Sequence, residues 1–312
     1  MSLSIGKVRI ENPFVLAPMA GVNCASFRLM CRKSGAGLVY TQMVDADVLA
    51  EKNKDDALKF LNILKDEKPV NLQLIGLNTK NLEKSVEMAE DAVDMFDYNI
   101  GCMEDDYAAK GMGADLLKYP EKIEKIVSFL RGKVNKPLTA KIRIGWDDQH
   151  INAVKICKIL ENIGVDAIAV HGRTATQKYS GKVNWTAIKQ IREKANIPII
   201  ANGDIQSGRD AVNMLEKTGC QFVMIGREAM HNPAVFKNCN EILKNIPPSK
   251  IDFKKQVLDF IDLYKKNENR ISVSELRTHV FWLCRDIKTK ENTKMLYGLD
   301  NPKKVREFVG KL

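Results

Sequence analysis

Cys102 is the residue of this chain best placed to do chemistry. It follows Met95–Tyr98, a short apolar run typical of a buried strand, and Asn99 and Gly101 lie between that run and the thiol. Ligands in α/β proteins bind where the strands end, so a thiol beside a side-chain amide and a glycine is placed to face a bound molecule. The alternative at this point is an ordinary buried cysteine, which is common in protein interiors.

Further residues that could face a ligand, most of them polar or glycine, end or follow most of the other apolar runs. In chain order these candidates are Pro18, Met19, Ala20 and Gly21, then Gln73, Lys141, Arg143, His171, Arg173, Asn202, Gly203, Asp204, Gly226 and Arg227. Taken singly, each of these residues could equally be an ordinary loop residue that faces solvent. As a set they predict one shared mouth, because the carboxyl ends of parallel strands meet at the same end of a barrel.

The last two runs end in the triplets NGD (202–204) and IGR (225–227). Glycine at a strand end lets backbone N–H groups approach a phosphate, and Arg227 supplies a planar, positively charged guanidinium with paired N–H donors. In α/β barrels the loops after these two strands are the usual phosphate-binding place. The pair of triplets therefore predicts a phosphate site.

Three other side chains suit a flavin ring. Lys141 can stabilise negative charge on a cofactor ring, and Gln73 carries both a donor and an acceptor. His171 can donate to a phosphate or a ring oxygen. The alternative for Lys141 is a surface lysine at the barrel rim, and the alternative for His171 is a hydrogen-bonded histidine of the core. Together with the phosphate site they predict flavin mononucleotide (FMN), with Lys141 near the reducible end of the ring. The absence of a GxGxxG motif argues against a Rossmann dinucleotide site.

The elements that position these residues repeat one unit, a short β-branched apolar run followed by a polar turn and a helical pattern. The runs are Phe14–Ala17, Leu38–Thr41, Val70–Leu74, Met95–Tyr98, Leu138–Ile142, Ala167–Val170, Ile197–Ala201 and Phe222–Ile225. Near-continuous apolar strands alternating with helices indicate a parallel sheet buried on both faces. Eight units predict a (β/α)₈ TIM barrel, with a doubly wound open sheet as the second choice.

The barrel has an expected addition at each end. Residues 1–12 alternate like a short hairpin that caps the barrel floor. After Pro247 and Pro248 the pattern is helical throughout, over Phe253–Lys266, Val273–Asp286, Thr289–Leu296 and Pro302–Lys311. We therefore expect a catalytic barrel over residues 1–246 and a small all-α domain over residues 247–312.

Composition narrows the class of protein. The 312 residues carry a net charge of +10, and residues 251–312 hold 14 Lys/Arg against 9 Asp/Glu, which suits a polyanion or simply a solvated helical face. No apolar stretch approaches the length of a membrane helix, and we expect no signal peptide. The seven cysteines form no CxxC pair, so we expect reduced thiols, no metal site and a cytoplasmic protein.

Motifs along nearly the whole chain resemble the tRNA-dihydrouridine synthases. They are APMAG (17–21), FR (27–28), GAGL (35–38), NLQLIG (71–76), NIGC (99–102), KIRIGW (141–146), VHGRT (170–174), IIANGDI (199–205), MIGR (224–227) and HVFW (279–282). The combination of NxGC, KIRxGW, HGRT and NGD at barrel spacing is highly specific. The resemblance implies an FMN-dependent barrel with a helical tRNA-binding domain, which reduces the 5,6 double bond of a uridine in tRNA with NADPH as the electron donor.

The resemblance also implies roles for individual residues. Those expected around FMN are Pro18, Met19, Ala20, Gln73, Lys141, His171, Asn202, Gly203, Asp204, Gly226 and Arg227. Asn99 would hydrogen-bond the uracil edge, and Arg143 and Arg173 would lie near the substrate. Reduced flavin would give hydride to C6 of the ring, and Cys102 would act as the general acid that protonates C5. The partners implied are tRNA and NADPH; we expect a monomer and no membrane contact.

Three departures from the family pattern bear on the substrate. Met103 stands where proline usually follows the cysteine, and Glu104–Asp106 replaces a loop that is often basic. In the tail, Thr278 and Leu283 replace the usual lysine and tyrosine around the histidine and tryptophan. Two alternatives stay open: an FMN barrel that reduces a small pyrimidine or enone, and a tRNA-binding protein without catalysis. The basic tail argues against the first alternative, and the intact Cys102 argues against the second.

Overall fold

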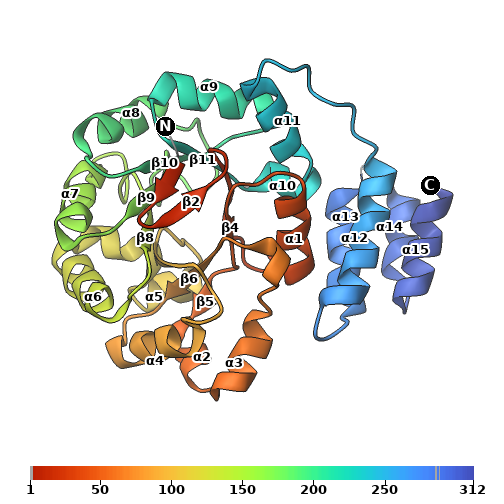
Figure 1. Cartoon of the computed structure of the whole chain (residues 1–312), viewed down its shortest axis with the longest axis horizontal. Coiled ribbons are helices and arrows are strands. Elements are labelled where there is room, and N and C mark those ends of the chain that lie inside the picture. The colour runs from red at the N-terminus through yellow and green to blue at the C-terminus, as the bar shows by residue number, and fades with distance from the viewer. Residues whose placement is uncertain (1–2, 285–286, 288) are drawn as a thin grey trace.

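The chain folds into a closed parallel barrel, as Figure 1 shows for the computed structural model, which describes residues 3–284, 287 and 289–312. The barrel strands are β3 (Phe14–Leu16), β4 (Val39–Tyr40), β6 (Val70–Ile75), β7 (Met95–Ile100), β8 (Leu138–Arg143), β9 (Ala167–His171), β10 (Ile199–Asn202) and β11 (Phe222–Ile225). They pair in parallel in the order β4, β6, β7, β8, β9, β10, β11, β3. A bridge from Val15 to Leu38 closes the ring, with Leu16 N donating to Leu38 O at 2.9 Å. The predicted TIM barrel is therefore confirmed.

Helices cover the outside of the barrel, as the alternating pattern predicts. They are α1 (Ala25–Lys33), α4 (Thr79–Ala89), α6 (Pro120–Lys133), α7 (Ala153–Ile163), α8 (Trp185–Lys194), α9 (Gly208–Thr218) and α11 (Val235–Leu243). Local sequence sets their ends: Pro120 starts α6, the Ser207 side chain caps the first turn of α9, and Gly164 ends α7 in a left-handed conformation.

A small insertion between β4 and β6 has no counterpart in the sequence prediction. It contains β5 (Val44–Asp45), α2 (Ala46–Ala50) and α3 (Lys54–Leu61). Asp45 and Asn53 cap the two helices through side-chain oxygens that accept from the backbone N–H groups of Asp47 and Asp56. These helices are too short for a clear 3.6-residue pattern, which explains why periodicity did not reveal them.

The N-terminal hairpin closes the floor of the barrel. β1 (Leu3–Ile5) and β2 (Val8–Ile10) pair in antiparallel fashion, and Ile5 and Ile10 are buried with inward-facing barrel side chains such as Met95 and Phe222. A side chain at Gly6 would collide with Asp166 and Pro137, which precede β9 and β8. The hairpin therefore blocks the amino ends of the strands, as predicted, and leaves the carboxyl ends as the open mouth.

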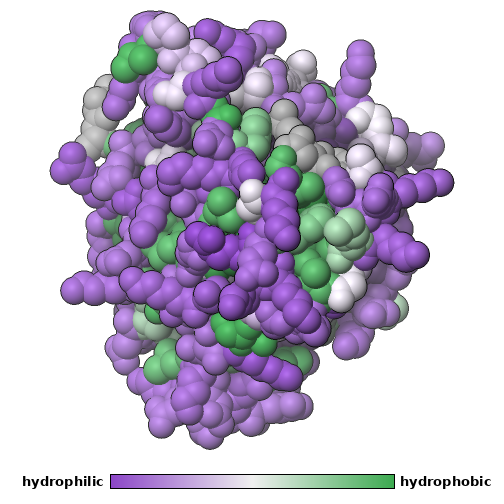
Figure 2. Space-filling view, turned by 90° about the vertical axis from the view of Figure 1, so that its right-hand side faces the viewer, coloured by the Kyte–Doolittle hydropathy of each residue, from purple (hydrophilic) through white to green (hydrophobic). Residues whose placement is uncertain are grey.

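The chain ends in a group of helices beside α1 and α10 (Arg227–His231) (Figure 1). They are α12 (Phe253–Asn267), α13 (Val273–Leu283), α14 (Lys290–Tyr297) and α15 (Pro302–Lys311). The predicted all-α addition is confirmed; residues 285 and 286, in the expected extension of α13, lie outside the described residues. Figure 2 looks onto this end of the molecule and shows a mostly hydrophilic surface with smaller hydrophobic groups.

Buried contacts hold these helices against the barrel. Glu268 Oε1 accepts from the backbone N–H of Ser26 at 2.7 Å, and the ring of His279 reaches back to the carbonyl oxygen of Val22 at 2.9 Å. The other ring nitrogen of His279 lies 3.0 Å from the carbonyl of Glu275. Cys24 Sγ lies 3.7 Å from the same Nε2 atom, so the ring of His279 is enclosed by contacts with both the barrel and its own helix.

Candidate active site

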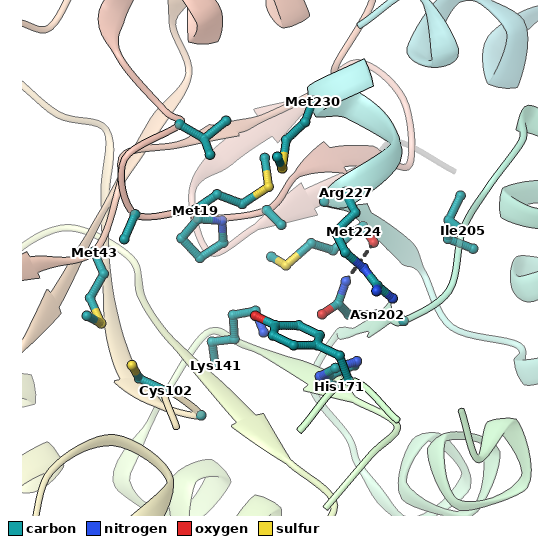
Figure 3. Close-up of a pocket in the computed structure, with 18 of the residues that line it drawn as sticks. Met19, Met43, Cys102, Lys141, His171, Asn202, Ile205, Met224, Arg227 and Met230 are labelled. Atoms are coloured by element: carbon teal, nitrogen blue, oxygen red, sulfur yellow. Dashed lines mark hydrogen bonds between the residues drawn. The ribbon is translucent and has the colours of Figure 1, made fainter. Parts of the chain in front are cut away.

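A cavity of about 800 Å³ opens at the carboxyl ends of the strands, within the usual size of ligand pockets. Every candidate from the sequence except Gly21 and Arg173 lines it: Pro18, Met19, Ala20, Gln73, Asn99, Cys102, Lys141, Arg143, His171, Asn202, Gly203, Asp204, Gly226 and Arg227. Figure 3 shows Cys102 and Lys141 on one side of the cavity and Asn202 and Arg227 on the other. The predicted shared mouth is therefore present, while the individual roles of these residues stay predictions.

The thiol of Cys102 sits in a turn that is tied to β7. The strand runs two residues beyond Tyr98, where the sequence pattern ends it, because Asn99 and Ile100 still pair with β8. Asn99 Oδ1 then accepts from the backbone N–H groups of Gly101 at 2.9 Å and Cys102 at 2.8 Å. This side-chain bond closes the turn and fixes the position at which the thiol leaves the sheet.

A second contact holds the turn from the other side. Ala114 N donates to the carbonyl of Cys102 at 2.7 Å, and Gly113 has φ +60°. A Cβ at Gly113 would lie 2.6 Å from the Cys102 carbonyl oxygen, so only glycine fits there. The turn is therefore clamped between β7 and the segment that leads into α6.

The thiol keeps its proton at neutral pH. Burial raises the pKa of Cys102 above its usual value, and the charge of Glu104 raises it further. A hydrogen bond with the backbone of Glu104 and the positive charges of Lys141 and Arg143 act in the opposite direction but do not overcome burial. Such a thiol is suited to donate a proton and is a poor thiolate nucleophile.

Burial also changes the two basic groups at the centre of the cavity. It lowers the pKa of Lys141 to about 8, with Arg143 lowering it further and Asp97 opposing the shift. Burial and the nearby positive charges of Lys141 and Arg143 hold the pKa of His171 well below its usual range. At neutral pH Lys141 is therefore mostly charged, while His171 is a neutral imidazole with one donor and one acceptor nitrogen.

Arg173 lies behind the cavity wall and not in it. Its guanidinium donates to both carboxylate oxygens of Asp204, at 2.8 and 2.6 Å, and the side chain is only 3% exposed. Arg227 donates to the same carboxylate at 2.8 Å from the pocket side, where its side chain is 55% exposed. Two guanidinium groups share the Asp204 carboxylate, and Arg227 is the one of the two that faces the cavity, which Glu228 also lines.

The same end provides the cradle that a phosphate requires. Gly203 has φ +131°, and a Cβ there would lie 2.6 Å from a side-chain carbon of Val183. A Cβ on Gly226 would point at Met19 Sδ, 3.6 Å away, and so into the cavity. Two strand ends without side chains, beside the guanidinium of Arg227, fit the phosphate of a flavin mononucleotide.

Sequence reasoning missed several residues that line the cavity. They are Met43, Met224, Met230, Tyr179, His231 and Trp282. The methionines carry no sequence signal for a site, because such residues are normally assigned to a core. The ring of Tyr179 lies between Arg227 and Arg143, 5.1 and 6.0 Å from their guanidinium carbons. Trp282 belongs to the HVFW motif, but only the fold shows that α13 reaches the mouth, where the Trp282 carbonyl accepts from His231 Nδ1 at 3.0 Å.

The acidic loop after Cys102 forms the short helix α5 (Asp105–Ala109). Glu104 lines the cavity, whereas Asp105 is exposed and lies 3.5 Å from Lys178. Asp105 and Asp106 occupy the first turn of α5, where negative charge is favoured by the helix dipole. Of the three acids, Glu104 is thus the one that lines the cavity.

The fold and the cavity define a (β/α)₈-barrel enzyme with its site at the carboxyl ends of the strands. The model of the dihydrouridine synthase (Dus) family matches residues 15–306, so the chain belongs to that family. The resemblance drawn from the motifs is thereby confirmed, and with it the class of flavin-dependent oxidoreductase.

Relatives and solved structures agree with this assignment. The chain is 32% identical to tRNA-dihydrouridine synthase B of Pseudomonas aeruginosa over 284 residues, covering 89% of this chain and 85% of that protein. It is 30% identical to tRNA-dihydrouridine synthase B of Salmonella typhimurium, covering 91% and 90% of the two chains. The fold resembles an old yellow enzyme homologue from Zymomonas mobilis (TM-score 0.54, 11% identity, covering 82% and 95%) and morphinone reductase (0.55, 12%, 80% and 90%).

No helix in the described ranges 3–284, 287 and 289–312 is long and apolar enough to cross a membrane.

Proposed function

We propose that this chain reduces the 5,6 double bond of a uridine in tRNA to give dihydrouridine, with FMN as its flavin and NADPH as the electron donor. The observation that carries the proposal is the proton-bearing thiol of Cys102, held by Asn99 at a strand end in the same cavity as Lys141. The cavity thus holds a proton donor, a charged lysine and a site that fits a phosphate.

The cavity has separate places for the parts of FMN. Gly203, Gly226 and Arg227 hold the phosphate, because the backbones of both glycines line the cavity there and Arg227 is an exposed cation beside them. Gln73, Lys141 and His171 contact the ring, with Lys141 supplying positive charge. The remaining contacts come from Pro18, Met19, Ala20, Asn202 and Asp204, which line the same cavity.

The uracil ring binds on the side of the cavity that holds Asn99 and Cys102. When bound, reduced flavin supplies the hydride that adds to C6 of the uracil ring. Cys102 Sγ then gives its proton to C5, which completes the saturated ring. Asn99 holds the uracil edge through its amide, and Arg143 lies near the substrate. Because Arg173 is buried against Asp204, its role is to position that carboxylate and not to contact the substrate.

A uridine inside folded RNA must leave its stack to enter this cavity. The helical domain over residues 247–312 and the barrel rim would hold the surrounding RNA backbone, so affinity should fall with salt. Glu104 faces the cavity and would repel a phosphate, so the flanking nucleotides must enter away from it. We further propose a catalytic barrel over residues 1–246 and a monomeric enzyme that works in the cytoplasm.

The first experiment is the absorbance spectrum of the purified protein, with mass analysis of the molecule that heat releases. Flavin bands and the mass of FMN are the expected result; a colourless protein that FMN does not reconstitute would contradict the proposal. The second is nucleoside mass analysis of tRNA from a strain that lacks its own dihydrouridine synthases. Expression of this chain should restore dihydrouridine, and a small-pyrimidine reductase or a non-catalytic tRNA binder would not restore it.

A further inference from the structure

A continuous chain of hydrogen bonds runs beneath the cavity from a buried carboxylate to the backbone of Cys102. Gln73 Nε2 donates to Asp97 Oδ2 at 2.6 Å, and Asn99 Nδ2 donates to Gln73 Oε1 at 2.7 Å. Asn99 Oδ1 accepts from the N–H of Cys102 at 2.8 Å. Asp97 is 1% exposed and does not line the cavity, whereas Gln73 and Asn99 do.

The Cys102 end fixes which atoms donate and which accept along this series of hydrogen bonds. A backbone N–H can only donate, so Asn99 must turn its oxygen toward the turn and its nitrogen toward Gln73. Gln73 must then offer its oxygen to Asn99 and its nitrogen to Asp97. Asp97 Oδ2 is therefore required to accept, and it stabilises the orientation of the Gln73 amide that Asn99 imposes.

The other oxygen of Asp97 has a different partner. Thr139 Oγ1 lies 2.5 Å from Asp97 Oδ1 and accepts from Asn71 Nδ2 at 2.9 Å. The threonine hydroxyl has one proton, which it donates either to Asp97 or to the Phe96 carbonyl, 3.4 Å away. If Asp97 takes up a proton, that proton must sit on Oδ1 while Thr139 turns to Phe96. Oδ2 remains an acceptor in both states.

We propose that Asp97 is a positioning residue of this site, whose Oδ2 atom holds the amide of Gln73 in the one orientation that Asn99 and the Cys102 turn permit. This inference rests on the proposed function of the cavity, because it assigns those two amides to ring recognition. With Asp97 in place, Gln73 keeps one further N–H for a ring carbonyl oxygen, whereas the second N–H of Asn99 is directed at Met43 Sδ, 3.3 Å away. Without that acceptor, Gln73 Nε2 loses the partner that opposes a turn of the amide. A turned amide breaks its bond with Asn99 and directs its oxygen at the ligand, where it repels a carbonyl oxygen.

Two substitutions separate the acceptor from the charge. Asp97→Asn removes the charge, but its oxygen can still face Gln73 while its amide nitrogen donates to Thr139. Asp97→Leu has a similar size and removes the acceptor. We expect Asp97→Asn to keep dihydrouridine formation within about tenfold of wild type and Asp97→Leu to lose about a hundredfold, the cost of a misplaced reacting group. Equal losses in the two variants would mean that the charge matters and the acceptor does not, which overturns the proposal.

A rescue experiment tests the same link without flavin or substrate. Gln73→Glu sets two carboxylates at the 2.6 Å contact and should lower the urea midpoint of the flavin-free protein. Adding Asp97→Asn gives the new glutamate a donor and should restore the midpoint. The matched control is Asp94→Asn in the Gln73→Glu background, because Asp94 accepts from Val70 N outside this chain of bonds and should give no rescue.

The outcomes distinguish this inference from the proposed function. A double variant no more stable than Gln73→Glu alone would show that Asp97 does not fix the Gln73 amide, and the proposal fails. If wild-type protein forms no dihydrouridine but the rescue occurs, the orientation of Gln73 is supported while the function is wrong. In that case the assignment of the two amides to ring recognition is lost with the function.

Discussion

The side-chain oxygen of Asn99 lies 2.8 Å from the backbone nitrogen of Cys102. Asn99 belongs to β7 and Cys102 lies beyond its end, so this bond ties the thiol to the rigid sheet. A reacting group on a strand end is held more precisely than one on a free loop, because the supporting element does not move with the loop. The same amide also binds Gln73, so the position of the thiol and the polarity of the cavity wall are set together.

Asn99→Ala should therefore slow catalysis more than it weakens flavin binding. The substitution removes both turn bonds, and a thiol displaced by about 1 Å costs roughly a hundredfold in turnover. Single-turnover oxidation of the reduced enzyme by tRNA measures the step. Asn78→Ala is the control, since Asn78 caps the exposed start of α4 away from the thiol. Turnover at the wild-type rate in Asn99→Ala would show that the bond does not position the acid.

Cys102→Ala should abolish dihydrouridine formation while leaving the flavin reducible. General acid catalysis contributes about 10²- to 10⁴-fold, so we expect a loss of that size in the tRNA-dependent step. Reduction of the flavin by NADPH, followed by absorbance, should stay within about twofold of wild type. Cys157→Ala is the matched control, because Cys157 is buried in α7 on the outside of the barrel. Full tRNA reduction by Cys102→Ala would exclude the thiol as the proton donor.

Much of this site is predictable from sequence because a parallel barrel brings all carboxyl strand ends to one place. Residues such as Lys141 and Asn202 need only a correct strand assignment to be placed in the mouth. Arg173 shows the limit of that reasoning. Its side chain turns behind the wall to bind Asp204, and no strand pattern states which way a side chain turns after its strand ends.

Trp282 shows a second limit. The tail is recognisable as helical from its periodicity, but the packing of α13 against the mouth depends on long-range bonds such as His279 to Val22. Strand-end reasoning ignores residues that reach the mouth from a separate helix. The methionines of the cavity are hidden for another reason: an apolar flexible side chain has the same sequence signature in a core and in a cofactor pocket.

Flavin binding should weaken as pH rises through about 8. Burial lowers the pKa of Lys141 to that value, so its positive charge is present below pH 8 and is lost above it. We expect FMN affinity to fall by about tenfold between pH 7 and pH 9.5, the size of one charge-assisted contact. Titration of flavin-free protein with FMN at a series of pH values measures the effect.

Lys141→Arg should keep its charge over that range and give a flat pH profile, even if affinity at pH 7 is lower. Lys136→Arg, at the amino end of the barrel where its side chain binds the carbonyl of Glu90, should keep the wild-type profile. A wild-type affinity that does not change between pH 7 and pH 9.5 would contradict the role of Lys141.

Asp97 should make the protein less stable as pH rises from about 4 to about 6. Burial raises the pKa of Asp97 from 3.8 to about 6, so the folded state holds this proton after the unfolded chain has lost it. The stabilisation is complete below pH 4 and is lost as pH passes about 6; a difference of about two pKa units corresponds to about 3 kcal/mol. The Asp97→Asn side chain cannot titrate. Its unfolding free energy, measured by urea denaturation at each pH, should therefore fall less steeply than that of wild type between about pH 4 and pH 6. The same slope in wild type and variant would assign the effect to other groups.

The C-terminal helices should contribute to tRNA binding through exposed lysines. Lys290, Lys294 and Lys303 lie on exposed positions of α14 and α15. Removing residues 251–312 is a poor test, because Glu268 and His279 make buried bonds to the barrel and truncation would uncover its core. The triple substitution of these lysines by glutamine avoids that problem, since each side chain is exposed.

We expect the triple variant to bind tRNA about tenfold more weakly at low salt and to show a shallower dependence of log Kd on log salt, because fewer counterions are released. The control replaces three exposed lysines of the outer barrel helices, Lys125, Lys155 and Lys189. That control has the same net charge but should keep nearly the wild-type salt slope, since α6, α7 and α8 lie on the side of the barrel opposite the helical end (Figure 1). Equal losses in both triples would mean that net charge, and not the tail surface, determines binding.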